Sequence, residues 1–472
     1  ERIGAALEAA LLENPGNVHL QRQMMLLHGA QITTIHSFCL SVIREHFHML
    51  KLDPGFRIAD EAELSLIWSD VLSELLEESY EQADTAFLSL VECYGSAKSD
   101  KPIEDYVKRL YRYAVSQPWS GQWLDSIRDS FSCDAEAFGS HPFLGLIMEE
   151  VKRSLSDALA LQRKMVQLTK EAGGPALYRD CFLQDGECLA ELSLAAEHGY
   201  AAFAKAVSEV SFSRLPSKKQ DAEEWKKERA KALRAALKDI IAKLKKDFFY
   251  EPFSEMQEEL FAMKEPVGAL VQLTLDFMER LSAAKEEKNL LDFSDLEQFS
   301  LQILVGKEDG LPVPTEAARL LAARYDEIMI DEYQDSNLVQ EYLLQSISGE
   351  PDGRYNRFMV GDVKQSIYKF RQARPEFFME KYGRYGDTVA ERKISLHRNF
   401  RSRQEVTDRV NYVFSRIMRE DLGGITYDAE AALYPGGAYP ATAGAEAELL
   451  LLAADGESEL SRVEQEAALV AE

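Results

Sequence analysis

YDEIMIDEYQDSN occupies residues 325–337 of the chain, VGDVKQSIYKFR residues 360–371, and LHRNFRS residues 396–402. Each segment contains or follows a short apolar run that is bounded by polar residues. Such runs between helical patterns predict strands, here at residues 327–330, 357–360, 393–396 and 448–452. Strands that alternate with helices predict an α/β fold with a parallel sheet and crossover helices.

The first strand ends in the acidic residues Asp331 and Glu332. An apolar strand that delivers two carboxylates at its end is how a nucleotide hydrolase holds Mg²⁺ and aligns the attacking water. We expect Asp331 to hold Mg²⁺, and Glu332 to orient or deprotonate that water. The alternative is a helix N-cap followed by a first-turn acid. The polar Gln334 and Asp335 that follow favour a ligand site.

The second segment places a glutamine just ahead of two aromatic residues and an arginine. Gly361 permits a tight exit from the sheet. Gln365 can donate to a phosphate and accept from water, so it can sense a γ-phosphate. Tyr368, Phe370 and Arg371 can present two rings and a guanidinium to unpaired bases. Their spacing suggests an extended segment with both rings on one face. Alternatively, both aromatic residues belong to the core.

The third segment supplies Arg401 just after an expected strand. An arginine that leaves the tip of a strand can stabilise charge on a transferring phosphoryl group. The alternative is a surface arginine that pairs with a carboxylate.

Near the N-terminus, residues 30–35 predict a short strand and residues 37–49 a helix. Thr34, His36 and Ser37 lie at this junction. Together with the first amides of the helix they can contact a DNA phosphate. Ser37 or Thr34 can also simply cap the helix, and both interpretations can hold at once.

The remaining chain is mostly helical in pattern. Residues 1–27 predict a helix broken near residue 15, and residues 60–286 predict helices almost throughout. Residues 214–246 carry twelve Lys or Arg against five Asp or Glu, and form either a DNA-phosphate contact or a solvated helical arm. The sequence LLDFSDL predicts the start of a helix capped by Ser294 or Asp295, a structural feature.

The composition of the chain limits the classes of protein to which it can belong. A chain of 472 residues with 46% apolar and 28% charged residues predicts a soluble protein of two or three domains. No apolar run approaches the roughly 18 residues of a membrane span. Five cysteines without a CxxC pair favour a reducing, cytoplasmic setting. A net charge of −26 argues against a protein that coats DNA, but allows a narrow DNA channel.

Together these segments resemble the UvrD/Rep/PcrA class of superfamily 1 DNA helicases. The matching strings, in family order, are TTIHSFC (motif Ib), LLDFSDLE, IDEYQDSN (motif II), VGDVKQSIYKFR (motif III) and LHRNFRS (motif IV). TTIHSFC and the RPE after motif III look most like the helicase–nuclease branch. Within that branch the chain resembles AddA-type proteins most, and RecB is the more distant relative.

The resemblance implies a 3′→5′ single-strand DNA motor that works from double-strand ends in recombinational repair, with ATP and Mg²⁺ as cofactors and an AddB-type protein as heterodimer partner. It implies that residues 1–60 and 287–390 are parts of a first RecA-like domain, 1A. Residues 61–286 would be its helical insertion, 1B, and residues 391–472 the start of a second RecA-like domain, 2A.

The chain departs from the family pattern at the phosphate-gripping loop, because GxxxxGK[ST] is absent. The nearest string, at residues 305–308, lacks the first Gly and the Ser/Thr. We therefore expect an internal piece of a longer protein, which by itself does not hydrolyse ATP. The nuclease domain, with its iron–sulfur cysteines, would lie beyond it. Two alternatives are a UvrD-like repair helicase without nuclease and a non-catalytic DNA-binding scaffold.

Overall fold

The computed structural model describes residues 2–27, 29–96, 99–131, 141–218, 221–386, 388, 390–420, 424–440, 448, 452 and 461–471. Two compact units make up the chain: Glu1–Asp326 with Asn337–Asp352, and Glu327–Ser336 with Gly353–Glu472. The described residues form many helices and four separate two-stranded sheets, three of them parallel. The α/β class is confirmed in this coarse, mostly helical form.

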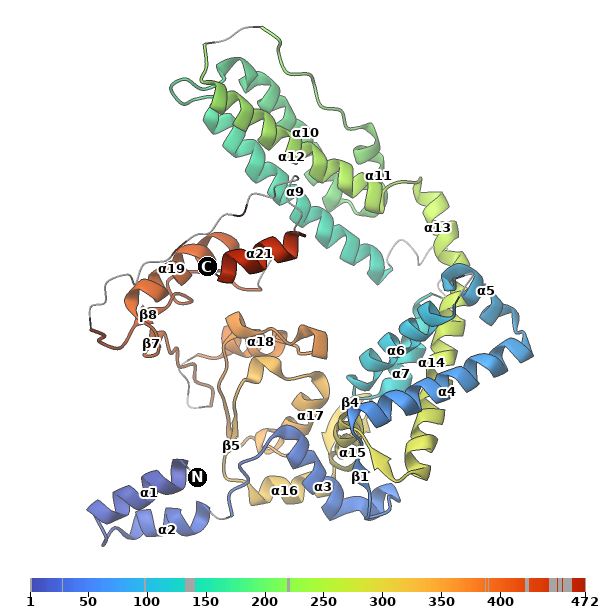
Figure 1. Ribbon diagram of the computed structural model, residues 1–472, viewed down its shortest axis with the longest axis vertical. Helices are drawn as coiled ribbons and strands as arrows, with labels where there is room; N and C mark the ends of the chain where they lie inside the picture. The colour runs from blue at the N-terminus through green and yellow to red at the C-terminus, as the bar shows by residue number, and fades with distance from the viewer. Residues whose placement is uncertain are drawn as a thin grey trace. The chain divides into compact units, whose positions relative to one another are not determined.

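The first two helices, α1 (Arg2–Glu13) and α2 (Val18–Leu27), pack against each other (Figure 1). They are separated at the predicted turn. Asn17 follows that turn, and its Oδ1 accepts a hydrogen bond from the backbone N–H of His19 at 3.0 Å. This is the cap expected at the start of a helix, and the predicted break is confirmed.

The third helix, α3 (Ile35–Leu50), begins where a strand was predicted. The predicted strand at residues 30–35 is wrong, because residues 30–34 pair with no strand in the described chain and Ile35 is already helical. The backbone is extended at Thr34, as its β-branched side chain favours, but a strand also needs a neighbour for its hydrogen bonds. Here the extended backbone serves only to enter α3.

In the described chain the long central stretch is helical, as predicted, and clusters of buried apolar residues join its helices. Some clusters join the helices of the first half of the stretch to α14 (Lys264–Glu287), and another joins α9 (Pro142–Leu168) to its successors. Figure 1 shows these two groups of helices. The remaining helices are α4 (Glu61–Gln82), α5 (Thr85–Tyr94), α6 (Lys101–Val115), α7 (Ser120–Ser130), the 3-10 turn η1 (Ala176–Tyr178), α10 (Arg179–Glu197), α11 (Tyr200–Glu209), α12 (Glu224–Phe248) and α13 (Phe253–Ala262).

A pair of two-residue strands closes this helical stretch. Strand β1 (Arg57–Ile58) precedes α4, and β2 (Leu290–Leu291) follows α14. The two strands pair in parallel, with Arg57 opposite Leu290. The chain therefore leaves for the helical stretch and returns from it at neighbouring strands, which is the arrangement of an insertion.

Helix α15 (Phe293–Leu304) follows β2 directly. Its N-cap is Asp292, not Ser294 or Asp295 as predicted. Asp292 Oδ1 accepts from the backbone N–H of Asp295 at 2.9 Å, and Asp295 Oδ2 accepts from that of Asp292 at 2.8 Å. This reciprocal capping box explains why Asp295 was mistaken for the cap. The segment is structural, as interpreted.

An antiparallel hairpin, β3 (Val305–Glu308) and β4 (Leu311–Pro314), follows α15. Its turn residues, Asp309 and Gly310, have φ values of 47° and 83°. The string nearest to a phosphate loop is therefore a hairpin strand. Helices α16 (Glu316–Arg324) and α17 (Leu338–Ser346) and the 3-10 turn η3 (Glu350–Asp352) complete the first unit.

In the second unit, β5 (Ile328–Ile330) pairs in parallel with β6 (Arg357–Met359), so both predicted strands are confirmed. Short 3-10 turns follow both strands, and a helix ends this part of the chain. These elements are η2 (Tyr333–Asp335), η4 (Val363–Gln365), η5 (Lys369–Arg371) and α18 (Glu376–Arg384).

The next predicted strand, at residues 393–396, is wrong. Its apolar side chains Ile394 and Leu396 are 62% and 85% exposed, and residues 393–396 join no strand in the described chain. The strand is instead β7 (Arg398–Asn399), which pairs with β8 (Tyr434–Pro435). Helices α19 (Gln404–Ile417) and α21 (Arg462–Ala471) also belong to this unit. The predicted strand at residues 448–452 lies largely outside the described residues.

Four of the cysteines are free in the described chain: Cys39, Cys93, Cys181 and Cys188. Cys133 lies outside the described residues. None of the described helices combines the length and apolar character that crossing a bilayer requires.

Candidate functional site

The acidic pair, Asp331 and Glu332, stands at the exposed end of β5. Asp331 Oδ1 accepts a hydrogen bond from the backbone N–H of Glu332 at 3.0 Å. Glu332 has left-handed backbone angles (φ 50°, ψ 41°), which cost a non-glycine residue about 1–2 kcal/mol. The chain therefore turns sharply after the strand. Glu332 makes no capping hydrogen bond to η2, which weighs against the simple N-cap interpretation.

A buried glutamine joins the acidic pair to the end of β6. Gln334 is only 1% exposed, and its Nε2 donates to Glu332 Oε2 at 2.7 Å. Its Oε1 accepts from the backbone N–H of Asp362 at 3.0 Å. A Cβ on Gly361 would lie 2.5 Å from Gln334 Oε1. Glycine is therefore needed at residue 361 for this close approach, in addition to the predicted exit from the sheet.

Asp362 connects Gln334 to Gln365, the residue predicted to sense the γ-phosphate. Gln365 Nε2 donates to Asp362 Oδ2 at 3.0 Å, and Lys364 Nζ lies 2.9 Å from Asp362 Oδ1. Burial alone would raise the pKa of Asp362, but hydrogen bonds from Lys364 and Gln365 hold it below its ordinary value. The carboxylate is thus kept ionised. Glu332, Gln334, Asp362 and Gln365 form one chain of hydrogen bonds, which we call the sensor chain.

The predicted stacking surface lies three residues beyond the sensor chain. Tyr368 is 36% and Phe370 73% exposed, so these rings are not core residues. Their ring centroids are 5.9 Å apart, and the guanidinium of Arg371 lies 5.1 and 5.6 Å from the two centroids. The predicted extended segment is wrong, because residues 369–371 form the 3-10 turn η5. That turn gathers the three side chains into one exposed cluster.

Arg401 lies in the second unit, two residues beyond β7. Its backbone N–H donates to Asn399 Oδ1 at 2.9 Å. Its exposed guanidinium forms no hydrogen bond or ion pair with another described residue. The alternative of a surface ion pair therefore has no partner in the described chain.

In the first unit, Thr34 is the N-cap of α3. Its Oγ1 accepts from the backbone N–H of Ser37 at 3.3 Å and donates to Ser37 Oγ at 3.0 Å. The capping interpretation is confirmed. Both residues remain exposed, so capping does not remove them from a ligand.

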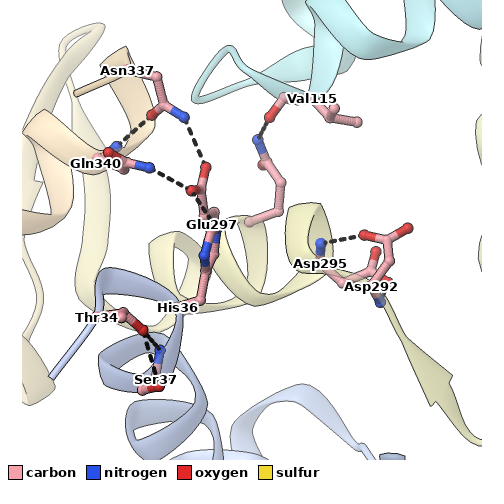
Figure 2. A network of polar contacts seen from close by, with 10 residues as sticks. Thr34, His36, Ser37, Val115, Asp292, Asp295, Glu297, Asn337 and Gln340 are labelled. Carbon is pink, nitrogen blue, oxygen red and sulfur yellow. Dashed lines mark hydrogen bonds and ion pairs between the residues drawn. The ribbon is translucent and has the colours of Figure 1, made fainter. Parts of the chain in front are cut away.

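His36 stands in the first turn of α3 and contacts a residue that the sequence interpretation missed. Its Nε2 lies 3.2 Å from Oε1 of Glu297, a side chain of α15. Glu297 also accepts hydrogen bonds from Asn337 Nδ2 at 2.9 Å and Gln340 Nε2 at 2.6 Å (Figure 2). A signal was present, because Glu297 lies on the same helical face as the apolar Leu301 and Leu304, where a charge is unusual.

Four cations of the basic segment at residues 214–246 form ion pairs with neighbouring residues of the first unit: Lys226, Lys227, Lys231 and Arg234. Lys226 and Arg234 are buried, and Arg234 forms a two-pronged ion pair with Asp185, with N–O distances of 2.7 and 2.8 Å. Lys227 and Lys231 pair with glutamates three residues earlier. These contacts favour the structural interpretation of this segment.

The acidic pair offers oxygen ligands of the kind that Mg²⁺ prefers. Asp331 Oδ2 has no partner in the described chain, and the buried Asp335 Oδ1 accepts no hydrogen bond. These carboxylate oxygens outnumber the hydrogen-bond donors around them, so some remain free to bind a cation such as Mg²⁺, which prefers oxygen ligands. No group of three or more potential metal ligands occurs among the described residues. A single carboxylate with phosphate oxygens and water would therefore complete such a site.

The sequence matches known proteins. A family model described as the UvrD/REP helicase N-terminal domain matches residues 1–386. A protein from Lachnoclostridium phytofermentans, named as the A subunit of an ATP-dependent helicase/nuclease, is 50% identical over 446 residues, which are 93% of this chain and 32% of that protein. Proteins of the same name from Bacillus velezensis and Acetivibrio thermocellus are 41% and 40% identical, over 96% and 91% of this chain and 37% and 35% of those proteins. The chain thus spans about a third of the length of these relatives.

Proposed function

Because the chain belongs to the UvrD/REP helicase N-terminal domain family, we propose that it is part of the motor of an ATP-dependent helicase–nuclease. The motor hydrolyses ATP, moves 3′→5′ along single-stranded DNA and unwinds duplex ends during recombinational repair of double-strand breaks. The observation that carries this proposal is the sensor chain, which runs from the acidic pair to the loop that bears Tyr368 and Phe370.

In this proposal the acidic pair works on the nucleotide. Asp331 holds Mg²⁺ through its exposed carboxylate, and Glu332 orients the water that attacks the γ-phosphate. The bound cation supplies charge neutralisation on the phosphate oxygens. Gln365 senses the γ-phosphate, and Arg401 stabilises charge on the phosphoryl group in the transition state.

The DNA contacts fall on two sets of residues. Tyr368, Phe370 and Arg371 stack on bases, which the exposure of both rings supports. Thr34, His36 and Ser37 contact a backbone phosphate at the start of α3. The backbone N–H groups of Ile35 and His36 have no acceptor in the described chain, so they remain available to an anion.

We propose the following domain assignment. Residues 1–60 and 287–390 are parts of domain 1A, and residues 61–286 are the 1B insertion. Residues 391–472 begin domain 2A. The parallel pairing of β1 with β2 supports the insertion, because it joins the chain on either side of α4 to α14.

The names of the relatives support a partner subunit for this protein. Their shared name describes one component of a multi-subunit helicase/nuclease, which supports a second component of the AddB type and a nuclease activity in the whole protein. The iron–sulfur cluster that the helicase–nuclease resemblance implies would be held outside this chain. The substrates are single- and double-stranded DNA ends, and the protein works in the cytoplasm.

The test is strand displacement by the full-length protein, meaning a chain of the length of the curated relatives. With ATP and Mg²⁺, it should unwind a duplex that has a 3′ single-stranded tail, and not one with a 5′ tail. Glu332→Gln should abolish unwinding while ATP still binds, because only the orientation of water is lost. Failure of the unaltered protein to unwind either substrate would overturn the proposal.

A further inference from the structure

The buried carboxylate of Glu297 stands between two parts of the first unit. Glu297 is 7% exposed in the middle of α15. A carboxylate so deeply buried must be compensated by donors, or it destabilises the fold. Three side chains surround it: His36 from α3, and Asn337 and Gln340 from α17 (Figure 2).

The two amide contacts have a fixed direction. Asn337 Oδ1 already accepts from the backbone N–H of Gln340 at 2.8 Å, as the N-cap of α17. Only its amide N–H groups remain for Glu297, so the carboxylate is bound to the first turn of α17. Asn337 directly follows Ser336 in the sequence and lies six residues after Asp331.

The contact with His36 fixes a side chain that is still accessible. Its side chain is 37% exposed, whereas that of Glu297 is 10% exposed. On one side the His36 ring packs on Phe293, with centroids 4.9 Å apart. Nε2 points to Glu297, which leaves Nδ1 as the ring nitrogen available to a ligand.

We propose that Glu297 is a positioning residue that holds His36 in its DNA-contacting orientation and ties that contact to the first turn of α17. This inference rests on the proposed function, because it takes His36 as a DNA contact. The inference goes beyond the proposed function, because it makes the DNA contact of His36 depend on a residue that touches no DNA. A change at the start of α17 would then reach His36 through one carboxylate.

The experiment measures binding of fluorescein-labelled oligo-dT to the full-length protein by anisotropy. Glu297→Gln keeps the shape of the side chain but removes the charge and turns one acceptor into a donor. We expect Glu297→Gln and His36→Ala each to weaken binding about three- to tenfold. The double variant should bind no more weakly than His36→Ala alone. The matched control is Glu308→Gln, an exposed glutamate of β3, which should bind like the unaltered protein.

DNA-stimulated ATP hydrolysis supplies a second readout. For Glu297→Gln, the half-saturating DNA concentration should rise by the same factor, while the rate at saturating DNA stays within about twofold. A purely structural role would lower the melting temperature and leave DNA affinity alone, and that result would overturn the inference. The inference would also be overturned if the losses of DNA affinity in the two single variants multiplied in the double variant.

Two outcomes separate this inference from the proposed function. If neither His36→Ala nor Tyr368→Ala weakens DNA binding, the inference and the proposed function both fail. If His36→Ala weakens binding and Glu297→Gln does not, only the inference fails. Should Glu297→Gln not fold, as judged by circular dichroism, Gln340→Ala decides. It should weaken binding about two- to fivefold, and unchanged binding would overturn the inference.

Discussion

Gln334 Oε1 accepts a hydrogen bond from the backbone N–H of Asp362 at 3.0 Å, and this contact joins the turn after β5 to the loop after β6. The same amide group donates to Glu332, so one buried side chain contacts both the acidic pair and the loop after β6. In the proposed motor, such a link would let the state of the nucleotide reach the residues proposed to hold DNA. The first two predictions test it.

Gln334→Ala should uncouple ATP hydrolysis from DNA in the full-length protein. It leaves the backbone N–H of Asp362 without its partner, which costs about 1–3 kcal/mol, or roughly tenfold or more in a rate that depends on that geometry. We expect the stimulation of phosphate release by single-stranded DNA to fall about tenfold. Gln345→Ala, at an exposed position of α17, is the matched control. Normal stimulation in Gln334→Ala would contradict the role of the sensor chain.

Gly361→Ala should produce a similar loss by a different route. The added Cβ would lie 2.5 Å from Gln334 Oε1, so the amide must move. In the Gly361→Ala/Gln334→Ala double variant the nearest obstacle is gone, and the remaining contacts, with Phe378 Cε2 at 3.2 Å and the backbone N of residue 334 at 3.3 Å, are much milder, so the two losses should not add. Gly383→Ala is the control, because nothing lies within 4 Å of its added Cβ in α18. Additive losses in DNA-stimulated ATP hydrolysis would show that Gly361 acts through something other than Gln334.

The sequence predicted the strands that carry the site because their evidence is local. At each of the strands β5 and β6, the apolar run and the turn residues that follow it lie within a few positions of one another. The link between them was missed because Gln334 and Asp362 are 28 residues apart. A buried glutamine in a polar string cannot be distinguished locally from an exposed one.

Glu297 was missed for a related reason. Its place on the apolar face of α15 was a local signal, but its contact with His36 joins positions about 260 apart in the sequence, which no local pattern encodes. The hairpin of β3 and β4 was different, because Asp309-Gly310 between two short runs is a local hairpin signal that the comparison with a phosphate loop obscured. The strand predicted at residues 30–35 shows the converse error, because β-branched residues favour extended backbone without supplying a partner strand.

Asp185→Asn should destabilise the helical stretch without affecting the site. Arg234 is 4% exposed, and the substitution leaves its guanidinium without a buried counter-charge. Removing one partner of such a pair costs about 3–5 kcal/mol. Urea unfolding monitored by circular dichroism should show that loss. The control is Glu228→Gln, which breaks the exposed ion pair with Lys231 and should cost less than about 1 kcal/mol.

Tyr368→Ala and Phe370→Ala should each weaken binding of single-stranded DNA by the full-length protein. Stacking is worth about 1–3 kcal/mol per base, so we expect a loss of about fivefold to a hundredfold in anisotropy titrations. Tyr368→Phe should bind normally, because stacking needs the ring and not the hydroxyl. Tyr355→Ala, which removes a ring that is 60% exposed elsewhere in the second unit, is the control. Unchanged affinity in Tyr368→Ala would refute the stacking assignment.

The 472-residue chain by itself should not turn over ATP, although it carries Asp331, Glu332 and Gln365. In the proposed mechanism these residues act on a γ-phosphate that must first be held by a lysine and backbone amides, and the sequence contains no GxxxxGK[ST] to supply them. Phosphate release by the purified chain with Mg²⁺ and single-stranded DNA should equal that of its Glu332→Gln variant. In the full-length protein the same substitution should abolish DNA-stimulated release. Turnover by the chain that Glu332→Gln removes would mean that its own residues hold the phosphates.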